Sequence, residues 1–409
     1  MPEQISKRVL AVVTDTIPSC IINVITPLQA MDQCGLIEAR TCTEDSVTPQ
    51  DIAWAEALVL CRNMDPTYRP IYDLAQRLGV PIIYDLDDYF VAVPPTHETY
   101  AAINNPERRQ HYEWLLASSH LVRVHSPVVE AHVRQFNQNA RLVWAAVDWS
   151  LVPDALPELD AEIFHVVYVA QSETGRALFP FMEADLKTLL DRYDHVRLHC
   201  LGYAPPSLCD HPQVICHPFQ HDYETFFRAF TRFGYAVGLA PMLHDDFHQG
   251  KTNLKYRDYA AAGTAGIYTD CPLYRNGVAH EETGLLVSGE VGSWLPAIER
   301  LMHDRQLLQS IRHNARQQVQ AKYNIDTVIA MWMQDLQSLP TRPPPDAALR
   351  EQVEAMRWWF TGRRARQKQS ILAPLRRLLR RTLPSRYKII YYDAIRRLRN
   401  IGKRHADQP

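Results

Sequence analysis

The sequence predicts an α/β protein built from two parallel sheets, each covered by helices. Short apolar runs rich in valine, leucine and isoleucine alternate with helical patterns along most of the chain. Such runs are typical of strands that are buried on both faces of a parallel sheet. The alternation stops in residues 150–162, which hold two prolines and several acids, and then starts again. The pattern therefore predicts two successive doubly wound halves with a linker between them.

In the first half, the expected strands are continuous apolar runs and the expected helices lie between them. Gly79 ends one helix, and Ser126-Pro127 is a suitable capping pair for another. The predicted strands cover 9–13, 57–61, 80–84, 120–124 and 142–144, and a predicted helix covers 71–78.

The second half repeats the scheme from residue 164. Its predicted strands cover 164–170, 196–202, 236–240 and 265–269, and its predicted helices cover 185–193, 223–233, 294–303, 304–322 and 326–339, with one more beginning near Lys251. The expected organisation is a first domain at 1–150, a linker at 151–163, a second domain at 164–339, and a proline-rich linker with a basic tail at 340–409.

Bulk properties narrow the classes of protein further. The 409 residues are too many for one ordinary core and suggest two domains. Eight scattered cysteines without a CxxC pair favour a reduced, cytoplasmic setting. The N-terminus lacks the pattern of a signal peptide, and no stretch of about 18 apolar residues suggests a membrane-spanning helix.

The most informative stretch lies in the second half. Residues 250–263 are Gly-Lys-Thr-Asn-Leu-Lys-Tyr-Arg-Asp-Tyr-Ala-Ala-Ala-Gly, which predicts a helix from near Lys251 to Gly263. Helix N-termini bind phosphates, and Lys251 and Lys255 add positive charge there. Asp258 lies on nearly the same face as Lys251, where a carboxylate can accept hydrogen bonds from ribose hydroxyls. The alternative is a solvent-exposed helix with a Lys255–Asp258 ion pair.

An ordered set of motifs runs from about residue 164 to 323. It consists of Gly238-Leu-Ala-Pro241, Lys251-Thr-Asn-Leu-Lys-Tyr-Arg-Asp-Tyr259, Gly263 and Thr283-Gly-Leu-Leu-Val287. This set resembles the donor half of GT-B glycosyltransferases, in particular the retaining glycosyltransferase family 4, or group 1. The resemblance implies two Rossmann-like domains facing a cleft, a nucleoside-diphosphate sugar as co-substrate, and no need for a metal or other cofactor.

The resemblance also assigns roles to residues of the helix motif. Asp258 takes the place of the family's second motif glutamate, which holds the ribose of the donor. Lys251 and Lys255 fall where basic residues approach the donor, and Asn253 belongs to the same donor-binding motif. The family's first motif glutamate would fall on Gly250, so that carboxylate is absent here.

Two further pairs are donor-binding candidates. Gly284 and Leu285 lie in the turn that the resemblance places next to the nucleotide pocket. Arg176 follows the first strand of the second half, where a basic residue can neutralise the leaving diphosphate, and Gly175 would let the backbone approach it. A surface arginine after a turn is the alternative.

Carboxylates gather at the end of a strand in the first half, in Tyr84-Asp-Leu-Asp-Asp88. A metal-binding DxD motif belongs to the other glycosyltransferase fold, GT-A, which two doubly wound halves do not fit. The favoured interpretation is an acceptor-side site that faces the cleft, with Asp87 and Asp88 as the functional residues. A turn or helix-capping role remains the alternative.

The C-terminal tail differs in charge from the rest of the chain. Residues 357–404 hold 16 Lys/Arg and one acid, which leaves 28 basic and 45 acidic residues elsewhere. Apolar and basic residues alternate there with helical spacing, which is typical of helices that lie on anionic membrane surfaces. The tail could instead bind nucleic acid, or pack its apolar face on the body or on a partner. Of these two alternatives, nucleic-acid binding is disfavoured.

Together these features predict a cytoplasmic, peripheral-membrane glycosyltransferase. It would move a sugar from a nucleoside-diphosphate sugar to a glycan or lipid-linked acceptor in the assembly of cell-surface polysaccharide. A nucleotide-sugar epimerase of the same fold is one alternative. A catalytically weakened scaffold that binds sugar nucleotide at the membrane is the other.

Overall fold

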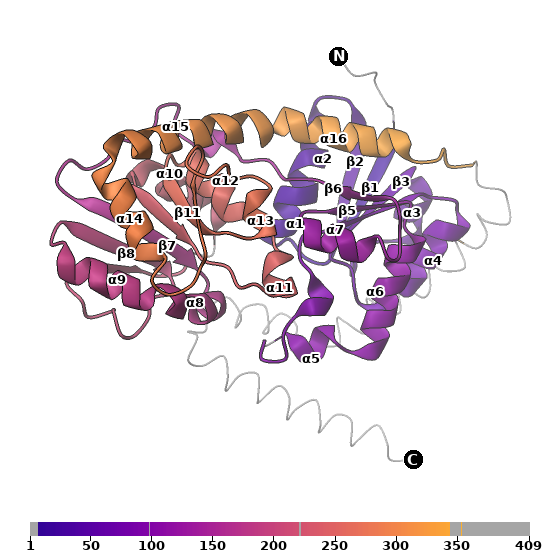
Figure 1. Cartoon of the computed structure of the whole chain (residues 1–409). Coiled ribbons are helices and arrows are strands. Elements are labelled where there is room, and N and C mark those ends of the chain that lie inside the picture. Colours follow the sequence, from indigo (N-terminus) through magenta and orange to yellow (C-terminus); the bar gives the residue numbers. More distant parts are fainter. Residues whose placement is uncertain (1–6, 98, 221, 344–352, 354–409) are drawn as a thin grey trace. The chain divides into compact units, whose positions relative to one another are not determined.

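A computed structural model describes residues 7–97, 99–220, 222–343 and 353. These residues form two six-stranded sheets in which every pair of neighbouring strands is parallel. Helices cover the sheets (Figure 1). The α/β architecture with two doubly wound halves is therefore confirmed. The predicted tail at 357–404 lies outside the described residues.

The first sheet has the strand order β2-β1-β3-β4-β5-β6. Its strands are β1 (Lys7–Val13), β2 (Ile37–Thr43), β3 (Ala57–Cys61), β4 (Ile82–Leu86), β5 (Leu121–Val124) and β6 (Ala140–Leu142). The helices of this half are α1 (Pro18–Cys20), α2 (Thr26–Gln33), α3 (Pro49–Trp54), α4 (Arg69–Arg77), α5 (Tyr100–Ile103), α6 (Pro106–Ser118) and α7 (Pro127–Val133). A π-helical turn at Ile21–Ile25 joins α1 to α2.

The second sheet has the order β12-β11-β10-β7-β8-β9. Its strands are β7 (Phe164–Ala170), β8 (Val196–Gly202), β9 (Val214–His217), β10 (Val237–Ala240), β11 (Ala265–Thr269) and β12 (Leu285–Val287). The helices that follow them are α8 (Ser172–Leu178), α9 (Pro180–Arg192), α10 (Tyr223–Phe233), α11 (Asp246–Gln249), α12 (Leu254–Ala261), α13 (Pro272–Arg275), α14 (Trp294–His303) and α15 (Arg305–Lys322).

The central strands match the predicted apolar runs, whereas β2, β9 and β12 were not predicted. All three lie at a sheet edge. In β2 only Ile37 is buried, β9 has two exposed residues at its centre, and β12 has only three residues. An edge strand needs no continuous apolar run, because one of its sides meets solvent or a loop. The pattern that identifies buried strands therefore misses them.

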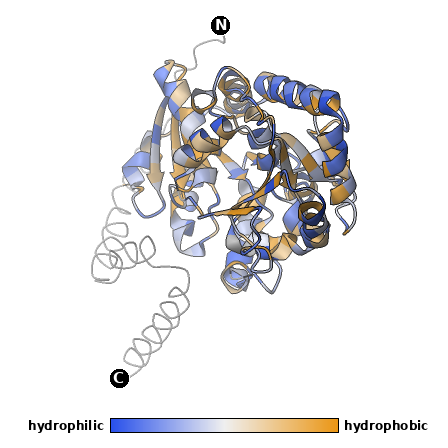
Figure 2. Cartoon of the chain, turned by 90° about the vertical axis from the view of Figure 1, so that its left-hand side faces the viewer, coloured by the Kyte–Doolittle hydropathy of each residue, from blue (hydrophilic) through white to orange (hydrophobic). Residues whose placement is uncertain are grey.

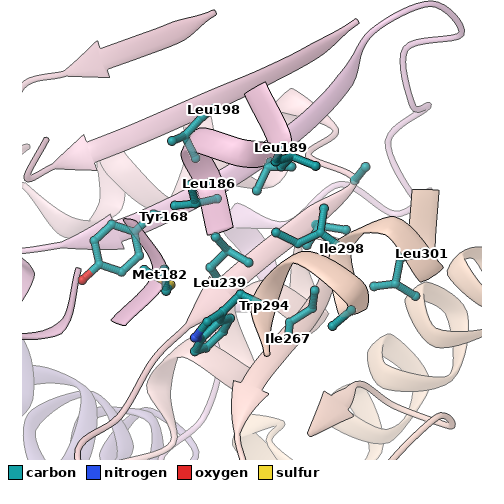
Figure 3. Close-up of a cluster of buried hydrophobic side chains, with 14 of the residues drawn as sticks. Tyr168, Met182, Leu186, Leu189, Leu198, Leu239, Ile267, Trp294, Ile298 and Leu301 are labelled. Atoms are coloured by element: carbon teal, nitrogen blue, oxygen red, sulfur yellow. The ribbon is translucent and has the colours of Figure 1, made fainter. Parts of the chain in front are cut away.

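The core of the second half lies between the sheet and helices α9 and α14. Leu186, Leu189, Trp294 and Ile298 are fully buried there against the strands (Figure 3). In Figure 2 the strands inside the molecule are mostly hydrophobic, and the outer helices carry hydrophilic residues. Burial of this one face, rather than helix propensity alone, fixes the helices on the sheet.

The last described helix, α16 (Ile325–Ser338), packs on the first sheet although it follows the second in sequence. Figure 1 shows α15 over the second half and α16 continuing over the first. Val328, Trp332 and Leu336 join the core of β1 and β3. Asp335 is fully buried and pairs with Arg123 and Arg141. The sequence predicted a helix at 326–339 but placed it in the second domain.

Candidate functional site

A cavity of about 450 Å³ opens at the carboxyl ends of the strands of the second sheet. Gln171 follows β7, Gly202 ends β8, His217 ends β9, and residues 218–220 follow it. One residue of the first half, Pro18 at the start of α1, also lines it. Open parallel sheets bind ligands at this edge, so the topology itself marks the cavity as the candidate site.

One wall of the cavity is aromatic and comes from α10. Tyr223, Phe226 and Phe230 lie along one face of this helix, as expected from spacings of three and four residues. Asp222 caps the helix by accepting a hydrogen bond from the backbone N–H of Thr225. An apolar wall beside a few polar groups is typical of sites for organic ligands.

Helix α12, which carries Lys255 and Asp258, also lines the cavity. Both residues line the cavity, as the sequence motif predicted. The helix begins at Leu254 and not near Lys251, because Lys251 lies in the loop between α11 and α12. Asn253 is the N-cap residue, and its side chain makes no capping hydrogen bond. Lys255 and Asp258 are therefore the two charged residues of the motif that reach the cavity.

Lys255 is held by the neighbouring strand. Its Nζ donates a hydrogen bond to the backbone carbonyl of Val169 at the end of β7. Burial lowers the pKa of Lys255 to about 8, and the nearby carboxylate of Asp258 partly opposes this shift. An ammonium group has three donors, so two remain for a ligand. Lys255 is still mostly charged at pH 7 and can stabilise an anionic group in the cavity.

Asp258 is buried, with 8% of its surface exposed. Burial raises the pKa of Asp258 to about 6, although Arg257, Tyr223 and Lys255 favour the charged form. The hydroxyl of Tyr223 donates to Oδ1 of Asp258 over 3.2 Å. The carboxylate is therefore ionised at pH 7 and has lone pairs left to accept ligand hydroxyls. Tyr223 was not predicted as a site residue, and the aromatic pattern of its helix was the available signal.

The other donor-binding candidates lie outside the residues that line this cavity. The Asn253 amide donates to the hydroxyl of Tyr323 over 2.8 Å. Arg176 is exposed on α8. Gly175 is packed so closely that an added Cβ would overlap the ring of Tyr203. Arg176 was expected in a loop after β7, and the structure places it in a helix instead.

Gly284 and Leu285 belong to the sheet. An added Cβ at Gly284 would lie 2.8 Å from the ring of Tyr268, and Leu285 begins β12 with its side chain in the core. Both have a clear packing reason for their identity. They do not line the cavity that contains Lys255 and Asp258.

The carboxylates of the first half contact cations of the protein. Arg62 donates through Nε to Asp87 over 2.6 Å and through Nη2 to Asp88 over 2.5 Å. Lys251 Nζ lies 3.7 Å from Asp88 and 4.3 Å from the centre of the Phe247 ring. Asp88 thus joins the first half to the loop before α12. Burial raises the pKa of Asp88, and the charges of Lys251 and Arg62 oppose that shift.

Gly250, at the position of the missing first motif glutamate, packs against the first half. An added Cβ would overlap Cβ of Tyr89 and lie 2.9 Å from the carbonyl oxygen of Asp246. A glutamate side chain therefore has no room here in this arrangement of the two halves. Among the described residues, no group of three His, Cys, Asp or Glu side chains is placed to hold a metal ion.

Comparison with known proteins identifies the fold. No protein-family model matches the sequence, and no curated protein matches it significantly. The structure is similar to sucrose-phosphate synthase from Thermosynechococcus elongatus, with a TM-score of 0.61 and 15% identity over 81% of this chain and 98% of that one.

Two other solved structures are similar over the same 81% of this chain. HepE of Anabaena, solved with UDP and glucose, has a TM-score of 0.59 and 13% identity over 100% of its length. A glycosyltransferase from Rickettsia africae has a TM-score of 0.56 and 11% identity over 98% of its length. These structures are GT-B glycosyltransferases. The likeness, together with the two parallel six-stranded sheets, establishes that this chain has the GT-B fold.

Proposed function

We propose that this protein is a glycosyltransferase that takes a sugar from a nucleoside-diphosphate sugar. One observation supports this proposal most directly. Lys255 and Asp258 on α12 both line a cavity at the carboxyl edge of the second sheet. A buried ammonium group suits a diphosphate, and a buried carboxylate suits ribose hydroxyls. The fold supports the proposal, because HepE was solved with UDP-glucose on the same architecture.

In the proposed mechanism, positioning and charge stabilisation supply most of the rate. Lys255 offers charge to the diphosphate as it departs, and Asp258 holds the ribose so that the donor keeps one orientation. Arg176, exposed one turn into α8, is proposed to reach the phosphates at the open end of the cavity. Asp87 and Asp88 are proposed to face the acceptor. Retention of configuration at the sugar is part of the proposal.

The proposed acceptor is a glycan or a lipid-linked glycan, and the proposed place is the cytoplasmic face of a membrane. This part rests on the basic tail at 357–404, which lies outside the described residues. No described helix is both long and apolar enough to span a bilayer. Co-sedimentation of the full chain with vesicles containing phosphatidylserine, with and without residues 357–404, tests it. Equal binding of both chains would rule out the tail as the anchor.

Calorimetric titration with UDP, GDP, dTDP and ADP and their sugars tests the donor site. We expect one base to bind in the micromolar range, and Asp258→Asn to weaken binding at least tenfold. Asp270→Asn is the matched control, because Asp270 is paired with Arg275 and lies outside the cavity lining. If none of the nucleotides binds the wild-type protein, the proposal is wrong.

One observation favours a second candidate, a scaffold that binds sugar nucleotide without transferring it. Gly250 stands where the motif resemblance expects the first glutamate, and its packing against Tyr89 leaves no room for that side chain. Release of free UDP, or of whichever diphosphate binds, measured with crude membrane acceptors separates the two. Tight binding without turnover would support the scaffold, whereas turnover would support the enzyme.

A further inference from the structure

Three histidines on neighbouring strands form a hydrogen-bonded row that ends at the cavity. His165 Nδ1 lies 2.9 Å from His199 Nε2, and His199 Nδ1 lies 3.1 Å from His217 Nε2. His199 is only 2% exposed, whereas His217 lines the cavity. The row therefore connects a cavity wall with the interior of the second sheet.

The strand register explains why the three rings meet. His199 on β8 is opposite Val167 on β7, two residues after His165, and opposite Ile215 on β9, two residues before His217. Residues two apart in a strand share a face of the sheet. All three rings thus lie on one face, and each step moves two residues toward the carboxyl edge, where the cavity opens.

The other end of the row meets a carboxylate near the surface. His165 Nε2 lies 3.9 Å from Oδ2 of Asp160. Oδ1 of Asp160 accepts the backbone N–H groups of Glu162 and Ile163, each over 2.8 Å, and these bonds lower the pKa of Asp160. Asp160 is therefore an anion with no proton to offer, and at 3.9 Å its charge favours the tautomer of His165 that carries the N–H on Nε2.

The tautomer of His165 sets which nitrogen donates and which accepts in every hydrogen bond of the row. A neutral imidazole has one N–H and one acceptor nitrogen. With its proton on Nε2, His165 accepts at Nδ1 from His199 Nε2–H. His199 then accepts at Nδ1 from His217 Nε2–H, which leaves Nδ1 of His217 as an acceptor. Burial and the neighbouring histidines lower the pKa of His199 to about 3, so its ring stays neutral.

We infer that His217 is a recognition residue of the cavity, which accepts a hydrogen bond at Nδ1 from an N–H or O–H group of the bound nucleotide. Among the described residues, Nδ1 of His217 has no hydrogen-bond partner. His199, His165 and Asp160 are positioning residues, because they hold the ring of His217 in the accepting tautomer. The inference rests on the proposed function for the identity of the ligand but not for the state of the row.

When the row takes up one proton, donor and acceptor exchange in each of its hydrogen bonds. If Nδ1 of His217 gains a proton, its Nε2 proton can pass to His199 Nδ1, and the Nε2 proton of His199 can pass to His165 Nδ1. Three N–H bonds form and two break, so the row gains one proton. His217 and His199 remain neutral, and the positive charge rests on His165 beside Asp160. Nδ1 of His217, the nitrogen that the row leaves unpaired, has then changed from acceptor to donor.

The surroundings of His165 set the pH at which this happens. Burial lowers the pKa of His165 from its usual value, Asp160 partly opposes that shift, and the charge of Arg197 adds to it. The rings of Phe233 and Tyr235 cover His199, and burial also lowers the pKa of His217. The row is therefore neutral at pH 7, and ligand binding through the acceptor weakens only when the pH falls below the ordinary pKa of a histidine.

Nitrogen NMR of the full chain labelled with [¹⁵N]histidine tests the tautomers without any ligand. At pH 8 we expect His199 and His217 in the Nε2–H form, with single-residue glutamine variants providing the assignments. Asp160→Asn keeps an Oδ1 acceptor for the two backbone N–H groups and removes the charge, so both rings should become mixtures of tautomers. A wild-type His217 in the Nδ1–H form at pH 8 would overturn the inference.

Calorimetric titration with UDP, GDP, dTDP and ADP at pH 8 and pH 5.5 tests recognition. His217→Ala should weaken the nucleotide that binds by about fivefold at pH 8, the value of one hydrogen bond. Asp160→Asn should weaken it by about twofold to threefold and leave only the pH dependence that comes from Asp258, whose carboxyl has a pKa of about 6. Asp222→Asn is the control, because Asp222 is also an exposed capping carboxylate, next to the cavity but outside the row.

Two results separate this inference from the proposed function. If His217→Ala binds like the wild type while Asp258→Asn does not bind, the donor site stands and the role of His217 is wrong. If the wild type binds none of the four nucleotides, the proposed function fails and the recognition role of His217 fails with it. The NMR experiment still decides the direction of the histidine row in that case.

Discussion

The two halves of the molecule place carboxylates near the carboxyl edges of their sheets in opposite surroundings. In the first half Arg62 binds both Asp87 and Asp88, so the protein itself supplies the countercharge. In the second half Asp258 has only the neutral hydroxyl of Tyr223 as a direct side-chain partner among the described residues. A buried charge without an ion pair destabilises the unliganded protein, and a ligand can supply what is missing. The contrast separates carboxylates whose charge the protein itself pairs from one whose charge is left for a ligand.

The largest expected effect is a loss of stability when the ion pairs of Asp87 and Asp88 are broken. Replacing Arg62 with Met leaves Asp87, which is 3% exposed, as an uncompensated buried charge. We expect a loss of about 3 kcal/mol in the free energy of unfolding, measured by urea denaturation at pH 7. Adding Asp87→Asn to Arg62→Met should recover much of that loss. Arg228→Met is the control, since the Arg228–Glu224 pair is exposed and should cost little.

Asp258 forms no ion pair among the described residues, so removing its charge should stabilise the protein instead of destabilising it. The pKa of Asp258 is about 6 in the fold and near its ordinary value of 3.8 in the unfolded chain, so the folded state favours the protonated form. Its contribution to stability is present below pH 3.8 and is lost as the pH rises through 6. Asp258→Asn should therefore raise the free energy of unfolding at pH 7.5 by about 1–2 kcal/mol, while it weakens nucleotide binding.

The pH dependence makes the Asp258 prediction specific. The advantage of Asp258→Asn should shrink between pH 6 and pH 4, because the wild-type carboxyl becomes protonated in that range. Asp270→Asn should show the opposite sign, because its partner Arg275 lowers the pKa of Asp270. If the wild type is more stable than Asp258→Asn at pH 7.5, the claim that the charge of Asp258 destabilises the unliganded protein is wrong.

Gly175 separates packing from donor binding. Gly175→Ala forces a methyl group into the ring of Tyr203 and should cost about 1–3 kcal/mol of stability. The affinity for nucleotide should change by less than twofold if the role of Gly175 is packing alone. Gly277→Ala, whose nearest atoms would lie 3.2 Å away, should cost less. A tenfold loss of affinity at unchanged stability would instead support the donor-binding role predicted from the sequence.

Arg176 should show the smallest effect on stability. Its side chain is exposed, so Arg176→Ala should change the free energy of unfolding by less than about 0.5 kcal/mol. If Arg176 contacts the diphosphate, calorimetry should show about a threefold to tenfold loss for UDP and no loss for uridine. Arg305→Ala, exposed at the start of α15, controls for the loss of surface charge. Equal losses for UDP and uridine would exclude a phosphate contact.

Local patterns in the sequence were sufficient to predict the central strands and a helix that carries Lys255 and Asp258, whose donor-binding roles stay a prediction. Apolar runs record burial on both faces, and the helix motif records which residues share a side of α12. Contacts between distant segments could not be predicted this way. The packing of Gly250 on Tyr89 and the row from His165 to His217 depend on strand order and register, which no local pattern contains.

The packing of α16 on the first sheet has a consequence for the order in which the protein folds as it is made. The strands of the first sheet are complete at Leu142, but Arg123 lacks its partner Asp335 until synthesis has advanced by almost half of the chain. At 5–20 residues per second that delay is roughly 10–40 s. The first half is therefore synthesised first, but its core is complete only after α16 has been made. Until then its apolar face is open to chaperones, and expressed alone it should aggregate.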